Sequence, residues 1–152
     1  MDEWVPCGLG VCAAEDGHAG TCAEASGWDE KPIRVQLSRR KGWRKPPNTV
    51  VVARPSKWGN PWRVTREQCT THDDLCWVVR RDGLGDHFST QERAHEYAVE
   101  VFREQLMHGL LPALEAHLPE LAGKNLACWC ARLPCHADVL LELANGPGAT
   151  HP

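Results

Sequence analysis

Short apolar runs alternate with segments of helical periodicity along most of the chain, and this alternation limits the folds that the chain can adopt. Four runs have the alternating or continuously apolar character of strands: residues 33–37, 49–53, 75–80 and 125–129. Three segments have helical character: the segment between Ser89 and Gly109, residues 112–121 and residues 134–145. Strands interleaved with helices predict an α/β domain, with a small sheet of about four strands flanked by about three helices.

Local signals set several of the expected boundaries. Ser89 is suited to cap the first helix, with Glu92 completing a capping box three positions later. Asp82–Gly83 predicts a turn after the third strand. Because residues 49–53 form a β-branched apolar run, we expect them to be a buried central strand.

Positive charge is concentrated in one segment of the chain. Residues 31–66 hold 11 of the 17 Lys and Arg residues and none of the 20 Asp and Glu residues, although the formal net charge of the chain is −3. Such a basic block repels itself, and an anionic partner relieves that repulsion. The bases within residues 39–45 therefore predict contact with nucleic acid, or they form a solvated surface without a partner.

The chain has no segment suited to a membrane or to export. A membrane-spanning helix requires about 20 consecutive apolar residues, and no stretch approaches that length. The first residues carry acids and lack the basic and apolar regions of a signal peptide. We therefore expect a cytoplasmic protein without membrane contact. In a reducing cytoplasm, the eight cysteines are expected to bind metal or perform thiol chemistry rather than form disulfides.

Two long motifs occur together in this sequence. They are RPSKWGNPW at residues 54–62 and CWCARLPCHADVLLELAN at residues 128–145. Together with GWRKPPN before the second strand, they resemble the domain of unknown function numbered 4326, a family found in bacteria and phages. The resemblance extends over roughly residues 33–145. It implies a compact α/β fold with a site where the two motifs meet, and it implies no particular reaction.

The loop of the first motif is a candidate ligand site, because ligands of open α/β sheets bind beyond the carboxyl ends of strands. Six residues supply its polar, flexible and aromatic groups: Arg54, Ser56, Lys57, Trp58, Gly59 and Asn60. The two bases can neutralise a phosphate, the hydroxyl and amide can orient a ligand, and the glycine lets backbone N–H groups approach it. The tryptophan can stack on a base, or it belongs to the core with the two bases as a solvated rim.

The second motif holds a cysteine cluster. Cys128 and Cys130 point to the same face of an expected strand, and Cys135 and His136 fall in the first turn of the helix that follows. In one interpretation, the first two cysteines and either Cys135 or His136 bind zinc. In another, Cys135 is a thiolate whose pKa is lowered by the helix start, with His136 or Asp138 as acid or base. In a third, small buried cysteines pack at a strand–helix junction.

Residues 1–30 lie outside the resemblance and have no helical or strand periodicity. They contain four candidate zinc ligands: Cys7, Cys12, His18 and Cys22. The segment resembles a zinc knuckle, although four residues rather than two separate its first pair of cysteines; the alternative is a disordered tail. We expect a cysteine- and histidine-rich appendage over 1–30, an α/β domain over 31–146 and a disordered tail over 147–152.

Three kinds of function are open. The one we favour is an enzyme that binds a nucleotide-like or nucleic-acid phosphate and acts on it through the two motifs. The second is a non-enzymatic, zinc-containing nucleic-acid-binding protein, and the third is a protein-interaction protein such as a phage accessory protein. The sequence contains no Walker loop, dinucleotide glycine motif, paired catalytic carboxylates or serine nucleophile elbow that would identify a reaction class.

Overall fold

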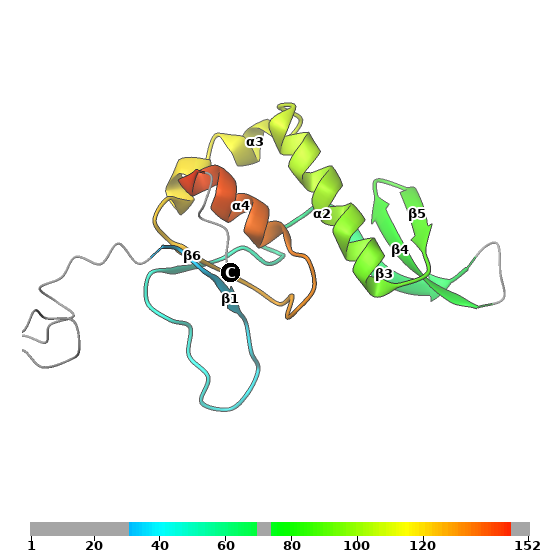
Figure 1. Cartoon of the computed structure of the whole chain (residues 1–152), viewed down its shortest axis with the longest axis horizontal. Coiled ribbons are helices and arrows are strands. Elements are labelled where there is room, and N and C mark those ends of the chain that lie inside the picture. Colours follow the sequence, from blue (N-terminus) through cyan, green and yellow to red (C-terminus); the bar gives the residue numbers. More distant parts are fainter. Residues whose placement is uncertain (1–30, 70–73, 147–152) are drawn as a thin grey trace, which may run out of the picture. The chain divides into compact units, whose positions relative to one another are not determined.

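Three short strands form a parallel sheet in the computed structural model, which describes residues 31–69 and 74–146. The strands are β1 (Arg34–Gln36), β2 (Thr49–Val51) and β6 (Asn125–Cys128), in the spatial order β1–β6–β2 (Figure 1). Val35 of β1 and Val51 of β2 flank Ala127 of β6. Because the strands are parallel, all three end at the same edge of the sheet.

The central strand of this sheet is β6. The prediction of a central strand at residues 49–53 is wrong, because within the described residues β2 pairs with β6 alone. The apolar side chains of that run serve a different purpose. Val52 and Ala53, which follow β2, are buried in the core, whereas Val51 is 37% exposed. The run therefore combines an edge strand with a buried connection to the next loop.

A second, antiparallel sheet follows β2 in the chain. Its strands, β3 (Arg63–Gln68), β4 (Leu75–Arg81) and β5 (Leu84–Phe88), lie in chain order. The turn predicted at Asp82–Gly83 joins β4 to β5, and the two residues have the positive φ angles, 51° and 85°, that a two-residue hairpin requires. The α/β class is thus confirmed, and its strands form two sheets of three rather than a single sheet.

Helical segments in the described residues are α2 (Gln91–Met107), α3 (Pro112–Glu115), the 3₁₀ helix η1 (Leu118–Leu121) and α4 (His136–Asn145). α2 begins one residue later than expected, because Thr90 rather than Ser89 accepts a hydrogen bond from the backbone N–H of Arg93, at 3.3 Å. The helix expected over 112–121 is divided into α3 and η1. Pro119 lacks the backbone N–H that a continuous α-helix would need at that position.

α2 packs against the antiparallel sheet and shares a hydrophobic core with the parallel sheet. In its first turns, Ala94 and Ala98 are buried with Val79 of β4. Further along, Phe102 and Leu106 join a larger core that also contains residues of β6 and α4. The middle of α2 therefore lies beside the carboxyl edge of the parallel sheet, where the two motifs begin.

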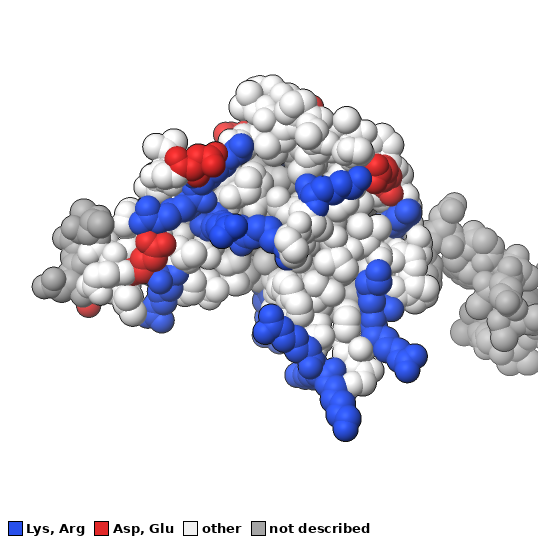
Figure 2. All heavy atoms as spheres, turned by 180° about the vertical axis from the view of Figure 1, so that it is seen from behind, with Lys and Arg blue, Asp and Glu red and all other residues white. Residues whose placement is uncertain are grey.

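The loop between β1 and β2 carries a dense group of exposed bases, here called the basic loop: Arg39, Arg40, Lys41, Arg44 and Lys45. Lys and Arg side chains project from the lower edge of the molecule in Figure 2, where Figure 1 places this loop. The guanidinium carbon of Arg39 lies 5.0 Å from the ring centroid of Trp129. The basic loop therefore reaches the second motif.

Two expectations fall outside the described residues. They are the zinc appendage, with Cys7, Cys12, His18 and Cys22, and the tail over residues 147–152. Among the helices that the structure does describe, none has the length and apolar character of a membrane span.

Candidate functional site

The carboxyl edge of the parallel sheet brings the two motifs together. β2 leads through Val52 and Ala53 to Arg54, and the neighbouring strand β6 ends at Cys128. A pocket with a volume of about 240 Å³ lies between these strand ends, α2 and α4. Six of its lining residues have guanidinium, imidazole or thiol side chains: Arg54, His95, Cys128, Cys130, Cys135 and His136. The two motifs thus form the wall of one pocket.

The three cysteines of the second motif converge in this wall. Their Sγ atoms all lie within 4.8 Å of one another, and those of Cys128 and Cys130 are 3.8 Å apart. None of the three forms a disulfide. A tetrahedral zinc centre with Zn–S bonds near 2.3 Å places its sulfur ligands about 3.8 Å apart. The three thiols therefore have a spacing suited to one shared ion.

Arg34 of β1 fixes the loop between the second and third of these cysteines. Its guanidinium donates to the carbonyl oxygens of Ala131 and Leu133, at 3.0 and 3.3 Å, and pairs with Oδ2 of Asp138 at 2.7 Å. Asp138, predicted as an acid or base, is therefore placed in an ion pair that joins the start of α4 to the parallel sheet. The ion pair and the two carbonyl contacts together hold the loop in the shape that brings the sulfurs close.

The three sulfurs shift one another's pKa. Hydrogen bonding with Cys130 and Cys135 lowers the pKa of Cys128 well below the ordinary thiol range. Hydrogen bonding to Cys128 raises the pKa of Cys130 to about 11 and also raises the pKa of Cys135, and burial adds to both shifts. The lowered pKa expected for Cys135 falls on Cys128 instead, because hydrogen bonding to the other two sulfurs and burial outweigh the effect of the helix start at Cys135.

His136 connects α4 to the end of β2. Its Nε2 lies 2.9 Å from the carbonyl oxygen of Val52, so Nε2 carries the hydrogen and donates it. Nδ1 then presents its lone pair toward Sγ of Cys135, 3.8 Å away. Burial lowers the pKa of His136, so the ring is neutral at neutral pH. This geometry makes His136 a positioning residue for the third cysteine, and the side chains that could hold a metal ion are the three thiols.

Replacing His136 by Gln is expected to weaken the dependence of stability on pH. Because burial lowers the pKa of His136 in the fold, the unfolded chain takes up a proton at a pH at which the folded chain does not. This contribution to the free energy of unfolding is complete above a pH of about 6.5 and declines below it, by up to about 1.4 kcal/mol per pH unit. Glutamine retains an N–H donor for Val52 and does not titrate.

Denaturant unfolding of both proteins at about pH 7.5 and about pH 5 measures the difference. The wild type should lose more stability than the variant over this interval. Equal losses would contradict a neutral, buried His136.

Arg54 is the cation of the pocket. Its Nη1 donates to the carbonyl oxygen of Asn60 at 3.2 Å, and this is its one hydrogen bond within the described residues. A Cβ atom on Gly59 would lie 2.5 Å from Cγ of Arg54, so only glycine lets the loop close over this side chain. Partial burial lowers the pKa of Arg54, and the charge of Cys128 acts in the opposite direction. The guanidinium stays protonated, with most of its N–H groups available to a ligand.

Asn60 lines the pocket but uses its side chain within the protein. Its amide nitrogen donates to the carbonyl oxygen of Ala98, and its amide oxygen accepts the backbone N–H of Trp62, both at 2.9 Å. These bonds attach the loop of the first motif to α2. Asn60 therefore positions the loop, and with it Arg54.

The remaining loop residues lie outside the lining of the pocket. Trp58 is 3% exposed and belongs to the core. Lys57 forms an exposed ion pair with Glu120 at 2.7 Å. The Oγ atom of Ser56 is buried and has no hydrogen-bond partner in the described part of the chain. Of the six residues predicted to contact a ligand, the structure brings Arg54 and Asn60 to the pocket.

Sequence reasoning missed two features. His95 lines the pocket from α2 together with Ala98 and Val99, and burial lowers its pKa. The i, i+3, i+4 spacing of these residues was the available signal. The second feature is a cluster in the antiparallel sheet whose ligand atoms lie within 4.8 Å of one another: Cys69, Cys76 and His87. Two of its members lie on neighbouring strands and the third directly follows another strand, and no local spacing connects them.

Comparison with known proteins identifies the family and nothing finer. The family model described as Domain of unknown function (DUF4326) matches residues 35–146. Neither the curated proteins nor the solved structures give a significant match. The family match confirms the resemblance carried by the two motifs and covers both walls of the pocket. Because it spans well over half of the sequence, this chain belongs to the family Domain of unknown function (DUF4326).

Proposed function

We propose that the pocket holds one zinc ion on Cys128, Cys130 and Cys135 and binds a small phosphate-bearing ligand of the nucleotide class through Arg54. One observation carries this proposal: three sulfur atoms lie within 4.8 Å of one another in the wall of a pocket that also contains a guanidinium. A metal centre and an anion-binding group then face the same small volume. That combination suits a ligand that is bound by its phosphate and exposed to the metal.

The donor set favours zinc. Thiolate ligands select zinc over magnesium and calcium, which prefer oxygen. Three protein ligands leave the fourth tetrahedral position to water or to the bound ligand, as in catalytic zinc sites. When bound there, zinc supplies a Lewis acid and lowers the pKa of a coordinated water.

His95 lines the pocket wall. Burial lowers its pKa, so the ring is neutral and can accept a proton there. A reducing compartment such as the cytoplasm would keep the three thiols available.

The pocket limits the size and nature of the ligand. Its volume of about 240 Å³ is below the range of about 300–1,000 Å³ that encloses a drug-sized ligand, so it fits a phosphate group with part of a nucleoside. Trp62 and Trp129 supply aromatic surface in the lining, and Trp129 is 47% exposed. A nucleobase can stack on such a surface. The phosphate would lie at Arg54, which offers a planar set of N–H donors.

A second candidate function is non-enzymatic binding of nucleic acid. Its support is the exposed basic loop, in which Arg39 stacks on Trp129 at the rim of the pocket. A nucleic-acid strand that runs along the basic loop would place one phosphate at Arg54 and other phosphates at the Lys and Arg side chains of the loop. Affinity for such a ligand would fall steeply with salt concentration, because each phosphate contact releases counterions. A mononucleotide would show a much shallower dependence.

Replacing Arg54 by Gln is expected to reduce the affinity for inorganic phosphate and for adenosine monophosphate. A hydrogen bond to a charged group contributes about 1.5–3 kcal/mol, which corresponds to a loss of about 10-fold to 150-fold in affinity. Isothermal titration of the zinc-loaded wild type and variant measures this loss. Arg132→Gln is the matched control, since Arg132 is an exposed arginine of the second motif that does not line the pocket. Equal affinity in Arg54→Gln and the wild type would overturn the assignment of Arg54 to the ligand.

A further inference from the structure

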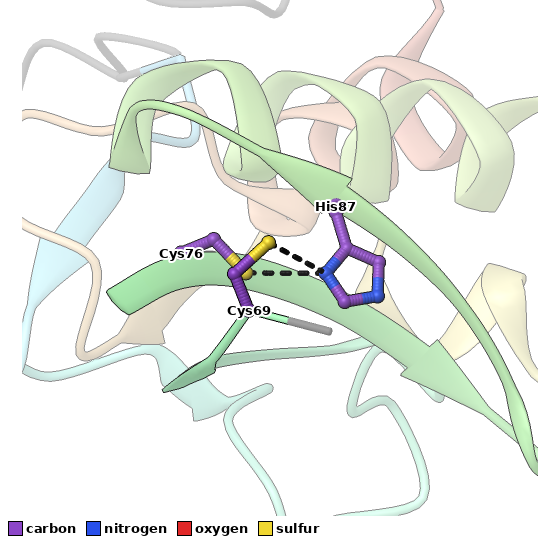
Figure 3. Close-up of side chains that lie close together, drawn as sticks. All are labelled: Cys69, Cys76 and His87. Atoms are coloured by element: carbon purple, nitrogen blue, oxygen red, sulfur yellow. Dashed lines mark hydrogen bonds between the residues drawn. The ribbon is translucent and has the colours of Figure 1, made fainter. Parts of the chain in front are cut away.

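A second group of metal-binding side chains lies in the antiparallel sheet, outside the lining of the pocket. Cys76 is on β4, His87 is on β5, and Cys69 directly follows β3. Figure 3 shows both sulfurs on the same side of the imidazole, facing Nδ1. Nδ1 of His87 lies 3.1 Å from Sγ of Cys76 and 4.0 Å from Sγ of Cys69. The three ligand atoms lie within 4.8 Å of one another.

Strand register brings these residues together. Glu67 pairs with Cys76 across β3 and β4, and Val78 pairs with His87 across β4 and β5. Alternate side chains of a strand point to the same face, so Cys76 and His87 are diagonal neighbours on one face. Cys69 follows Glu67 by two positions and continues the same alternation. Two strands and the residue that directly follows a third therefore each contribute one ligand at the same end of the sheet.

The cluster lies on the face of the sheet opposite to α2. The other face supplies the residues that pack with Ala94 and Ala98 of α2: Val64, Trp77, Val79 and Phe88. These residues occupy the alternate positions of β3, β4 and β5. Packing against α2 consequently gives no reason for two thiols and an imidazole to meet on the outer face.

The distances suit a single zinc ion. Zn–S bonds near 2.3 Å and Zn–N bonds near 2.1 Å in a tetrahedral centre separate sulfur from nitrogen by about 3.6 Å. The two observed sulfur–nitrogen separations, 3.1 and 4.0 Å, lie on either side of that value. Both sulfurs face the same ring atom, Nδ1, so Nδ1 is the imidazole ligand atom and Nε2 carries the hydrogen.

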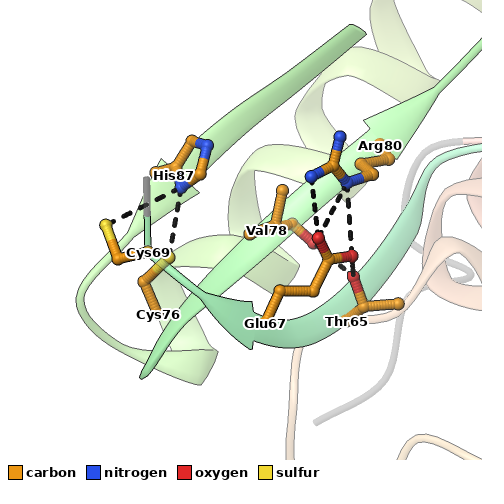
Figure 4. A network of polar contacts seen from close by, with 7 residues as sticks. All are labelled: Thr65, Glu67, Cys69, Cys76, Val78, Arg80 and His87. Carbon is orange, nitrogen blue, oxygen red and sulfur yellow. Dashed lines mark hydrogen bonds and ion pairs between the residues drawn. The ribbon is translucent and has the colours of Figure 1, made fainter. Parts of the chain in front are cut away.

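A carboxylate on the same face is already engaged and stays outside the ligand set (Figure 4). Oε2 of Glu67 forms an ion pair with Nη2 of Arg80 at 2.7 Å, and Oε1 accepts the hydroxyl of Thr65 at 2.6 Å. The remaining donors are two sulfurs and one nitrogen, a combination that selects zinc.

We propose that Cys69, Cys76 and His87 bind a second zinc ion, separate from the ion of the pocket. This ion cross-links the three strands of the antiparallel sheet at one end. Three protein ligands are provided by these residues, and the fourth position is completed by water or another side chain. The role of this ion is structural, because its ligands lie on β4, on β5 and directly after β3, and none of them lines the pocket. It stabilises the pairing of β3, β4 and β5.

Zinc content of the full chain tests this proposal. A variant with Cys69→Ser and His87→Gln changes one partly buried and one exposed side chain and keeps the buried Cys76. Measured by mass spectrometry after purification under reducing conditions without chelator, it should contain one zinc equivalent less than the wild type. Cys130→Ser should lose a different equivalent, and the combined variant should lose both. His108→Gln, at an exposed histidine outside the cluster, is the control and should lose none. Unchanged zinc content in the Cys69→Ser, His87→Gln variant would overturn the proposal.

Amide hydrogen exchange provides a readout that does not depend on the stoichiometry. Removing zinc from the wild type should accelerate exchange in β3, β4 and β5, because the metal cross-link between these strands is lost. Removing zinc from the Cys69→Ser, His87→Gln variant should leave exchange in the same strands unchanged. Equal acceleration in both proteins would overturn the assignment of the ion to this cluster. Either result leaves the pocket cluster testable through Cys130→Ser.

Discussion

A Trp58→Ala variant is expected to be less stable than the wild type by about 3–5 kcal/mol. Trp58 is 3% exposed and packs in the same core as Val52 and Leu126. Its ring also meets that of His117 edge to face, with 6.2 Å between the centroids. Domains of this kind have free energies of unfolding of only about 5–15 kcal/mol, so the loss would bring the variant close to unfolding. Guanidinium chloride denaturation followed by circular dichroism measures it.

Trp129→Ala is the matched control for this prediction. Trp129 is 47% exposed, and its removal should change the free energy of unfolding by less than about 1 kcal/mol. The pair separates two roles for tryptophan that the sequence alone leaves open: packing in the core and stacking on a ligand. If Trp58→Ala kept wild-type stability, the core role of Trp58 would be contradicted.

Removing zinc from the pocket cluster is expected to lower the free energy of unfolding by about 4 kcal/mol when free zinc exceeds its dissociation constant 1,000-fold. The ion would bind the folded chain, in which the end of β6 and the start of α4 hold the three sulfurs within 4.8 Å of one another. The unfolded chain does not keep the sulfurs together, so binding adds to stability.

Comparing the protein with and without zinc requires a variant in which the other cysteines cannot bind the metal. In this variant, here called the background protein, the cysteines outside the pocket cluster are replaced by serine: Cys7, Cys12, Cys22, Cys69 and Cys76. The free energies of unfolding measured by denaturation with zinc and with a chelator should then differ by about 4 kcal/mol. The same protein with Cys130→Ser should show no difference between the two conditions. A chelator that leaves the midpoint of the cluster-intact protein unchanged would contradict a stabilising ion at this position.

The parallel sheet and the meeting of the two motifs follow from features that a sequence carries locally. The segments 33–37, 49–53 and 125–129 have the length and the alternating or continuously apolar character of strands, and each contains an observed strand. Once such strands are placed in one parallel sheet, their carboxyl ends meet, which explains why Arg54 and Cys128 line one pocket.

The division into two sheets could not be predicted in the same way. β3 and β5 have the sequences RVTREQ and LGDHF, which offer few apolar residues because one face of the antiparallel sheet does not pack on α2. The edge position of β2 in the parallel sheet could not be predicted from the sequence either. Its apolar run suggests a central strand, but part of that run, Val52 and Ala53, packs in the core beyond the strand.

The roles of individual site residues depended on contacts between distant parts of the chain. Arg34 and Asp138 are 104 positions apart and yet form an ion pair at 2.7 Å. Asn60 was predicted to hold a ligand, whereas its amide bonds to the carbonyl oxygen of Ala98 on α2. His87 had no partner at a recognisable spacing. For such residues the sequence indicates the available chemistry, and the partner becomes known only from the fold.

The most direct test of the zinc centre in the pocket is the zinc content of the background protein that keeps only Cys128, Cys130 and Cys135. Purified under reducing conditions without chelator and measured by mass spectrometry, it is predicted to contain one equivalent of zinc. Addition of Cys130→Ser is predicted to remove it, because two sulfurs replace a three-sulfur site. A background protein that contains no zinc, or a Cys130→Ser variant that retains it, would contradict a metal centre on these three cysteines.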